Sequence, residues 1–297
     1  IGAGPAGLEA TRALAERGYE VALAEASRVL GGRVARERHL PGLSAWGRVA
    51  DYREYQISQK VNVESYFESA LDAESILEFG FENICIATGA SWRRDGVSRQ
   101  HVVPFPTDDA MKIYTPDDLM GEVNPTGNIV IFDDDHYYMG GVIAELLIQK
   151  GCSVTLVTPA AYVSEWTLNT LEQHEIHRRL AQMGVKIELN RGVTAIGKDY
   201  IETNCVFTGL TQPIGCDAVV LVTSKLENNR VYNDLKAREA EWADAGIKTV
   251  KLIGDANAPG PIAWATYAGH RYARELDGDD IGDALPFRRE VTELAID

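Results

Sequence analysis

The chain opens with Ile1-Gly2-Ala3-Gly4-Pro5-Ala6-Gly7, which has the spacing G-x-G-x-x-G. In such a stretch the first glycine permits a tight turn out of a strand, and the second lets the backbone approach a pyrophosphate. The third lets the following helix pack against the sheet. Residues 7–15 supply that helix, because strong helix formers alternate there with helically spaced apolar residues. The stretch therefore predicts a phosphate-binding turn made by Gly2, Gly4, Pro5, Ala6 and Gly7.

An acidic residue stands where such a site binds ribose. The next apolar strand covers residues 19–25 and ends in Glu25, 18 residues after Gly7. A carboxylate about 20 residues beyond the turn accepts hydrogen bonds from ribose hydroxyls and repels a 2′-phosphate. We therefore expect Glu25, with its neighbour Ala26, to contact a nucleotide. The alternative is a glycine-rich turn that has no ligand.

Composition excludes several classes of protein. The 297 residues carry a net charge of −15, which would repel nucleic acid, and their number suggests about two domains. No apolar run reaches the ~18–20 residues of a membrane span, and the start lacks the basic region of a signal peptide. The four cysteines form no C-x-x-C, so we expect reduced thiols in a cytoplasmic protein and no metal site.

Nearly all of the strand that should precede Gly2 is absent from the sequence. We therefore expect the natural polypeptide to extend upstream of Ile1, so that this chain is a fragment.

A second strand–helix–strand unit follows, and its phosphate turn lacks the early glycines. The strand at residues 127–132 leads into Asp133-Asp134-Asp135-His136-Tyr137-Tyr138-Met139-Gly140-Gly141, where only a late glycine is left for helix packing. Three carboxylates at the mouth of the turn would repel a pyrophosphate, and bulky side chains would block its approach. We therefore predict a Rossmann-like domain that has lost NAD(P)H binding. The alternative is an Asp-rich metal loop.

The order of these units predicts an α/β fold with two Rossmann-like domains, the second inserted in the first. Residues 1–120 and 248–297 are predicted to form the dinucleotide-binding domain, and residues 121–247 the inserted NAD(P)-like domain. A Pro/Asp-rich stretch at 115–118 marks the outward crossing, and the chain returns near 242–247.

Three further segments sharpen the interpretation. Leu30-Gly31-Gly32-Arg33 follows the acidic strand end, while Ile84-Cys85-Ile86-Ala87-Thr88-Gly89-Ala90 and Leu252-Ile253-Gly254-Asp255-Ala256 are strands that end in small-residue turns. Together with the first turn they resemble flavoproteins of the glutathione-reductase type, in which the corresponding segments line the flavin-dinucleotide site. The resemblance adds these residues to the site: Gly31, Gly32, Arg33, Ala87, Thr88, Gly89, Gly254 and Asp255. It places Asp255 near the ribitol or pyrophosphate, although Asp255 is also suited to cap a helix that begins at Ala256.

From end to end the chain resembles the C-terminal half of the trimethylamine/dimethylamine/histamine dehydrogenase family. The most specific stretches are GAGPAGLEATRALAERGYEVALAE, LGGRVARERHLPGL, IVIFDDDHYYMGGVIAELL and LKAREAEWADAGIKTVKLIGDANAPGPIA. The resemblance implies an upstream barrel domain with FMN and a [4Fe–4S] cluster, oxidation of a methylated or histamine-like amine, and electron transfer to an electron-transferring flavoprotein. It also implies that this half binds ADP, has no catalytic residue of its own, and belongs to a homo-oligomer.

Two other functions stay open. One is a working FAD-dependent NADH:flavin oxidoreductase of the 2,4-dienoyl-CoA reductase type, and the other is a non-enzymatic scaffold or oligomerisation module. ADP and FAD share the ADP moiety that these motifs recognise, so the sequence does not separate them. It does not name the amine either.

Overall fold

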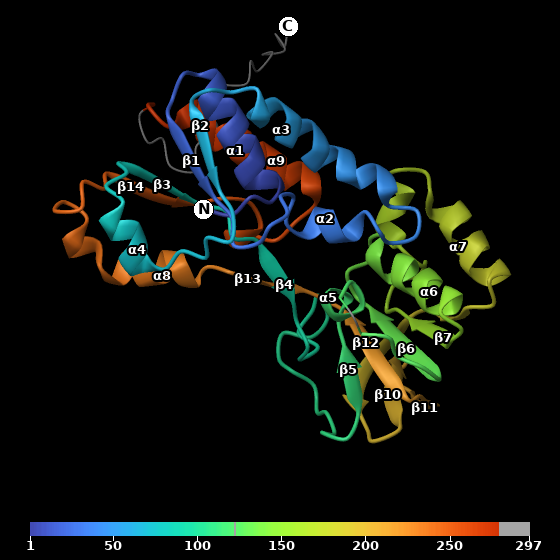
Figure 1. The fold of residues 1–297 in the computed structure, drawn as a ribbon. Coiled ribbons are helices and arrows are strands. Elements are labelled where there is room, and N and C mark those ends of the chain that lie inside the picture. The colour runs from blue at the N-terminus through green and yellow to red at the C-terminus, as the bar shows by residue number, and fades with distance from the viewer. Residues whose placement is uncertain (122, 279–297) are drawn as a thin grey trace, which may run out of the picture.

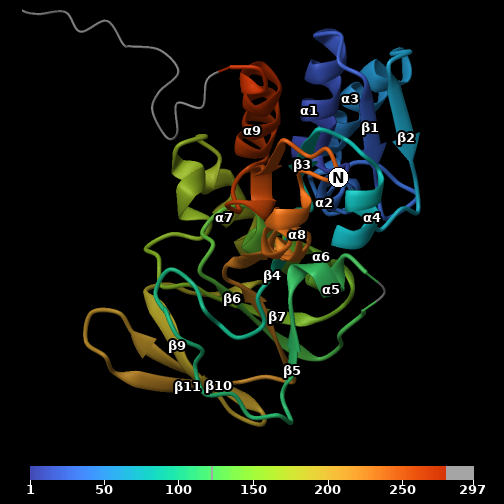
Figure 2. The same cartoon turned by 90° about the vertical axis from the view of Figure 1, so that its left-hand side faces the viewer.

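The structure is a computed structural model that describes residues 1–121 and 123–278. It has two lobes, which remain distinct when the molecule is turned by 90° (Figures 1 and 2). β4 (Ala90–Trp92) leads from the first lobe toward the second, and β13 (Lys225–Glu227) leads back. These two strands pair antiparallel, with Trp92 opposite Lys225. The link between the lobes is therefore a two-stranded ribbon.

The first lobe contains two parallel strand pairs flanked by helices. β1 (Val21–Ala24) pairs with β2 (Val63–Tyr66), and β3 (Asn83–Ile86) pairs with β14 (Thr249–Leu252). The helices are α1 (Pro5–Glu16), α2 (Arg33–Glu37), α3 (Arg48–Ser58), α4 (Ala73–Glu78), α8 (Arg230–Ala237) and α9 (Ile262–Glu275), with 3-10 turns η1 (Ser44–Gly47), η3 (Glu239–Glu241) and η4 (Gly254–Ala256). α1 contacts α3 and α9, whereas α4 contacts α8 beside the second pair (Figure 1).

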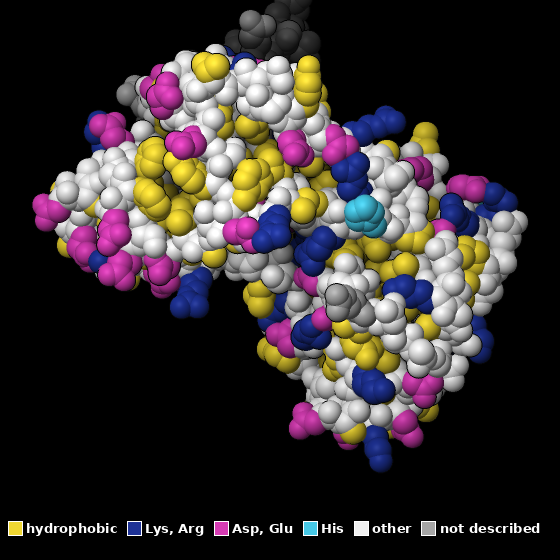
Figure 3. Space-filling view, viewed as in Figure 1, with side chains coloured by type: hydrophobic (Ala, Val, Ile, Leu, Met, Phe, Trp, Pro, Cys, Tyr) yellow, Lys and Arg dark blue, Asp and Glu magenta, His cyan; other side chains and the backbone are white. Residues whose placement is uncertain are grey.

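A hollow separates the two strand pairs. Its volume is about 450 Å³, and β1 and β3 both line it. Apolar side chains gather around it in Figure 3. The first residues lie at one end of the hollow, because the amino group of Ile1 donates to the Cys85 carbonyl at 2.7 Å and the Gly2 N–H donates to the Ala24 carbonyl at 2.8 Å. Ile1 and Gly2 thus hold the ends of β1 and β3 at a fixed separation.

The second lobe is built on a five-stranded sheet in the order β5-β12-β6-β7-β8, and every neighbouring pair is parallel. Its strands are β5 (Lys112–Tyr114), β6 (Asn128–Asp133), β7 (Ser153–Val157), β8 (Lys186–Glu188) and β12 (Ala218–Val222). Its helices are α5 (Pro116–Leu119), α6 (Met139–Gln149), α7 (Gln173–Gln182) and the 3-10 turn η2 (Glu165–Leu168). A three-stranded antiparallel sheet adds β9 (Arg191–Ile196), β10 (Tyr200–Cys205) and β11 (Thr211–Gly215).

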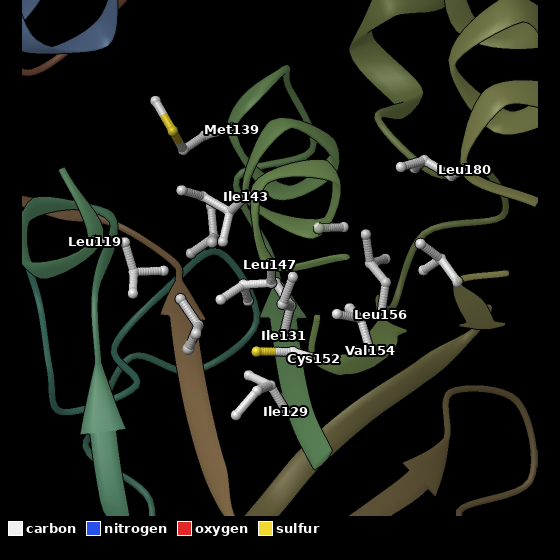
Figure 4. Close-up of a cluster of buried hydrophobic side chains, with 14 of the residues drawn as sticks. Leu119, Ile129, Ile131, Met139, Ile143, Leu147, Cys152, Val154, Leu156 and Leu180 are labelled. Carbon is white, nitrogen blue, oxygen red and sulfur yellow. The ribbon is translucent and has the colours of Figure 1, made fainter. Parts of the chain in front are cut away.

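The central strand β6 is buried on both faces. Ile129 and Ile131 pack with apolar side chains of α6 (Figure 4), whereas Val130 and Phe132 pack with those of β9 and β10. This alternation follows from the period of two residues in a strand. Parallel sheets that are covered on both faces require such continuous apolar strands. The α/β fold with a Rossmann-like unit and a parallel sheet, predicted from the sequence, is confirmed.

The lobes share part of one apolar core. Leu40 and Leu43 of the first lobe lie in the same buried cluster as the side chains between the parallel sheet and α6. Trp46 meets Tyr138 edge-to-face with ring centroids 5.6 Å apart. Because these contacts bury apolar surface, the lobes are packed against each other as well as linked by the ribbon.

Four elements lie on the other side of the predicted domain boundaries. β5 and α5 fall in residues 1–120, yet β5 pairs with β12 of the five-stranded sheet and α5 contacts β12 and α6. α8 and η3 fall in residues 121–247, yet α8 contacts α4 and β14 of the first lobe, and η3 follows α8 directly. Long-range strand pairing and helix packing place these elements, and the local sequence does not indicate them. Residues 279–297 of the predicted first domain lie outside the described residues.

Candidate nucleotide-binding site

The first glycine-rich turn has the backbone geometry that the sequence predicts. Gly2 has φ +94°, and a Cβ there would lie 2.6 Å from the Ala87 carbonyl oxygen. A Cβ at Gly7 would lie 1.9 Å from the Gly2 carbonyl oxygen, so any side chain would push α1 away from the turn. At Gly4 nothing lies within 4 Å of such a Cβ, which leaves open space in front of the backbone. Pro5 occupies the start of α1, where its missing N–H costs nothing.

Glu25 lies beside this turn and is held there by hydrogen bonds. The Ala3 N–H donates to its Oε2 at 2.8 Å, and the backbone N–H and hydroxyl of Ser27 both donate to its Oε1 at 2.9 Å. Because an ionised carboxylate has about four lone-pair sites, two on each oxygen, Oε2 keeps a site that is free to accept another hydrogen bond. Glu25 is therefore oriented in advance to accept hydroxyl groups of a ribose.

A cavity of about 1010 Å³ opens in front of the turn and extends to the second lobe. Its wall includes most of the residues that the sequence predicts for the site, which are Gly2, Gly4, Pro5, Ala6, Glu25, Gly32, Arg33, Ala87, Thr88, Gly89 and Asp255. These residues come from five separate segments of the chain. Residues of the second lobe that include Thr115, Leu119 and Met120 line its far end.

Four predicted residues do not line the cavity: Gly7, Ala26, Gly31 and Gly254. Gly31 has φ +101°, and its N–H donates to the Ala3 carbonyl at 2.8 Å, which ties this loop to the turn. Gly254 has φ +59°, and a Cβ there would lie 2.6 Å from that of Ala6. Gly31 and Gly254 therefore support the conformation of the backbone next to the cavity and do not line the cavity themselves. No contact explains why Ala26 should belong to the site.

Asp255 is engaged by the protein itself. Its Oδ1 accepts the Gly260 N–H at 3.1 Å, and its Oδ2 accepts Nη2 of Arg33 at 3.2 Å. The expectation that Asp255 caps a helix beginning at Ala256 is wrong. The chain forms the short turn η4 there, and α9 begins only at Ile262, after Pro261 in an extended conformation.

Several wall residues carry no sequence signal. The Asn228 side chain donates to the Thr88 carbonyl at 3.3 Å, and the Thr88 hydroxyl donates to the Asn228 carbonyl. Arg36, on the same wall, forms an ion pair with Asp117 of the second lobe at 3.0 Å. Both contacts join segments that are distant in the sequence, and the Arg36–Asp117 pair also crosses between the lobes, so only the folded chain identifies them.

The turn of the second unit is closed by its own side chains. The sequence predicts carboxylates at an open mouth, but Asp133 and Asp134 are completely buried. Asp133 accepts the N–H groups of Asp135 and His136 at 3.2 and 3.0 Å through its Oδ1. Asp134 contacts the His136 ring at 2.7 Å and accepts the Gln100 N–H at 2.9 Å. The Asp133 carboxylate therefore accepts the backbone N–H groups that would otherwise be free to bind an anion.

Burial and charge shift the acid strengths in this turn. Burial, reinforced by the nearby Asp135 carboxylate, raises the pKa of Asp133 to about 7. Burial opposes ionisation of Asp134 as well, but hydrogen bonds from His136, Ser98 and Gln100 lower its pKa on balance. Gly140 lies directly against Asp133, since a Cβ there would be 2.3 Å from Oδ2. The late glycine thus makes room for a carboxylate.

No three His, Cys, Asp or Glu side chains in residues 1–121 and 123–278 are placed to hold a metal ion. Burial raises the pKa of the Cys216 thiol to about 11, which suppresses its nucleophilic form. No helix in the described ranges is long and apolar enough to cross a membrane.

Comparison with known proteins agrees with this geometry. Residues 1–63 match the NAD(P)-binding Rossmann-like domain, and residues 114–212 match the OYE-like second alpha/beta domain. Dimethylamine dehydrogenase of Hyphomicrobium sp. (strain x) is 34% identical over 98% of this chain and 43% of its own length.

Solved structures that resemble this chain also include enzymes that act on amines. Histamine dehydrogenase from Rhizobium sp. 4-9 matches with TM-score 0.97 and 66% identity, over 99% of this chain and 46% of that one. The 6-hydroxypseudooxynicotine amine oxidase from Pseudomonas geniculata N1 matches with TM-score 0.88 and 41% identity, over 92% of this chain and 40% of that one. The chain thus spans less than half the length of these relatives.

Proposed function

Dimethylamine dehydrogenase and histamine dehydrogenase are close homologues of this chain, and we propose that it is the nucleotide-binding part of an amine dehydrogenase. In this proposal it binds ADP and contributes no catalytic residue. The amine, FMN and the [4Fe–4S] cluster are bound by an upstream barrel domain of the same polypeptide. That domain oxidises a methylated or histamine-like amine, and the electrons pass to an electron-transferring flavoprotein.

The observation that carries the proposal is the cavity in front of the first turn. Its wall combines the open face of Gly4, the N-terminus of α1 and the oriented Glu25 carboxylate. Backbone N–H groups and the helix dipole suit phosphate, and Glu25 suits ribose hydroxyls. The cavity is therefore matched to an adenosine diphosphate group.

The second turn supports a binding role over reduction by NADH. Asp133 already accepts the N–H groups of Asp135 and His136, and a pyrophosphate would have to displace a buried carboxylate of the same charge. We therefore infer that this half of the protein does not receive hydride from NAD(P)H. This argues against the alternative of a working NADH:flavin oxidoreductase.

The test is to denature the purified natural polypeptide and identify the released nucleotides by mass. ADP is expected from this site. FAD in its place would refute the ADP assignment, and the absence of any adenine nucleotide would leave a scaffold as the better function.

A variant tests the ribose assignment. Glu25→Ala should weaken ADP binding about 10-fold to 100-fold, because it removes charge-assisted hydrogen bonds of ~1.5–3 kcal/mol. Glu78→Ala, which changes an exposed carboxylate on α4, is the matched control and should leave ADP binding unchanged. Isothermal titration with ADP measures both. Equal affinities for the two variants would contradict the assignment.

A further inference from the structure

We propose that one segment of the first lobe couples the binding of a nucleotide to the docking of the second lobe. The segment covers residues 31–47, which we call the strap, and contains α2 and η1. α2 lies where the two lobes meet (Figures 1 and 2). The inference rests on the proposed function, because the nucleotide is the one bound in front of the first turn. In this proposal the nucleotide orders the strap, and the strap holds the lobes in one orientation.

The strap begins against the phosphate-binding turn. The Gly31 N–H donates to the Ala3 carbonyl at 2.8 Å, and a Cβ on Gly32 would lie 3.0 Å from the Cα of Gly4. Residues 32–36 all line the large cavity in front of the turn. A nucleotide in this cavity therefore lies against the strap as well as against the turn.

The other end of the strap is part of the second lobe. Leu40 and Leu43 are buried in the apolar cluster beneath α6, and Trp46 packs edge-to-face on Tyr138. Leu40 also lines the cavity. The wall of the nucleotide cavity and the apolar core between the lobes thus share a residue, so order at one is felt directly at the other.

Asp117 of α5 connects the strap to the ribbon. Its Oδ1 accepts Nη2 of Arg36 at 3.0 Å, and its Oδ2 accepts the Trp92 N–H of β4 at 2.9 Å. Arg36 is exposed, and an exposed ion pair adds little to stability. The two contacts nevertheless meet on one carboxylate. A docked strap therefore also fixes the ribbon against the second lobe.

The strap has little regular structure of its own. α2 has five residues and η1 has four, and residues 38–43 between them form neither helix nor strand. Its conformation therefore depends on the contacts at its two ends. A ligand that orders the first end lowers the entropic cost of docking the second, and this is positive cooperativity between nucleotide binding and lobe docking.

Hydrogen exchange of the natural polypeptide, measured by mass spectrometry after removal of bound nucleotide, tests the coupling. Spectra with and without ADP are compared. The diagnostic amides are those of η1 and of residues 138–142 at the start of α6, because neither stretch lines the cavity. ADP should slow their exchange about 10-fold, the size of an ordinary coupling between two sites. Residues 32–36 line the cavity and report binding itself.

A variant tests the same coupling from the other side. Trp46→Ala removes the contact with Tyr138 and leaves the cavity wall in place. Because coupling is reciprocal, this variant should bind ADP about 5-fold more weakly, and ADP should slow exchange at residues 138–142 by less than about 2-fold. Trp166→Ala is the matched control, since Trp166 is a partly exposed tryptophan of η2 that contacts Arg99 and does not line the cavity. It should keep both the affinity and the protection.

Two results would overturn the inference and leave the proposed function standing. One is slower exchange at residues 32–36 with ADP but no change at residues 138–142 of the unchanged protein. The other is a Trp46→Ala variant with unchanged ADP affinity and unchanged protection. If Trp46→Ala does not fold, the unchanged protein with and without ADP still decides. If ADP neither binds nor alters exchange anywhere, the proposed function fails and the inference fails with it.

Discussion

Asp133→Asn should make the protein more stable at neutral and alkaline pH. Asp133 is completely buried, its Oδ1 accepts two backbone N–H groups, and its Oδ2 has no hydrogen-bond partner. An asparagine has nearly the same shape and can accept the same two N–H groups through its oxygen. The substitution therefore removes a buried negative charge and leaves the packing intact.

The magnitude follows from the shifted pKa. The pKa of Asp133 rises from 3.8 to about 7, a difference of about 3 units. At 1.36 kcal/mol per unit this corresponds to about 4 kcal/mol. The folded state keeps its proton longer than the unfolded state, so stability falls as pH rises from about 4 to about 7. An asparagine does not ionise, so Asp133→Asn does not lose stability in this pH range. The increase in unfolding free energy relative to the unchanged protein should therefore approach its full size above pH 7.

Urea unfolding at pH 5 and pH 8 measures the effect. The difference in unfolding free energy between Asp133→Asn and the unchanged protein should grow from about 2 kcal/mol at pH 5 to about 4 kcal/mol at pH 8. Asp134→Asn is the contrasting control. Its carboxylate is ionised and paired with His136, so its loss should destabilise the protein at pH 8. A destabilised Asp133→Asn at pH 8 would refute the view that Asp133 is a strained buried charge.

Two further predictions concern the first lobe. Gly4→Ala should leave the melting temperature nearly unchanged and weaken ADP binding at least ~10-fold, since its Cβ meets open space where the phosphate approaches. Gly7→Ala should instead lower the melting temperature, because its Cβ would collide with the Gly2 carbonyl oxygen. Equal effects of the two variants on melting would contradict this division of roles.

Much of the site was predictable because its motifs are local. The turn at Gly2–Gly7 depends on which backbone conformations glycine allows, and that requirement is visible in the spacing alone. Glu25 follows at the end of the next strand, a distance set by one helix and one turn. The sequence also shows directly that the second turn lacks the early glycines and keeps only the late one at Gly140. These features determined an α/β fold and a nucleotide-type turn without reference to any distant residue.

Only the tertiary structure decided how distant charges combine. Arg33 and Asp255 are 222 residues apart, and nothing in either segment shows that each satisfies the other. The inward position of Asp133 depends on β12 and on the loop around Gln100, which cover the turn and exclude water. The placement of β5 and α8 likewise depends on which surfaces they bury. Backbone geometry is a local property that a short motif records. The partner of a buried charge is instead selected by long-range packing, because only the folded chain removes water from that charge.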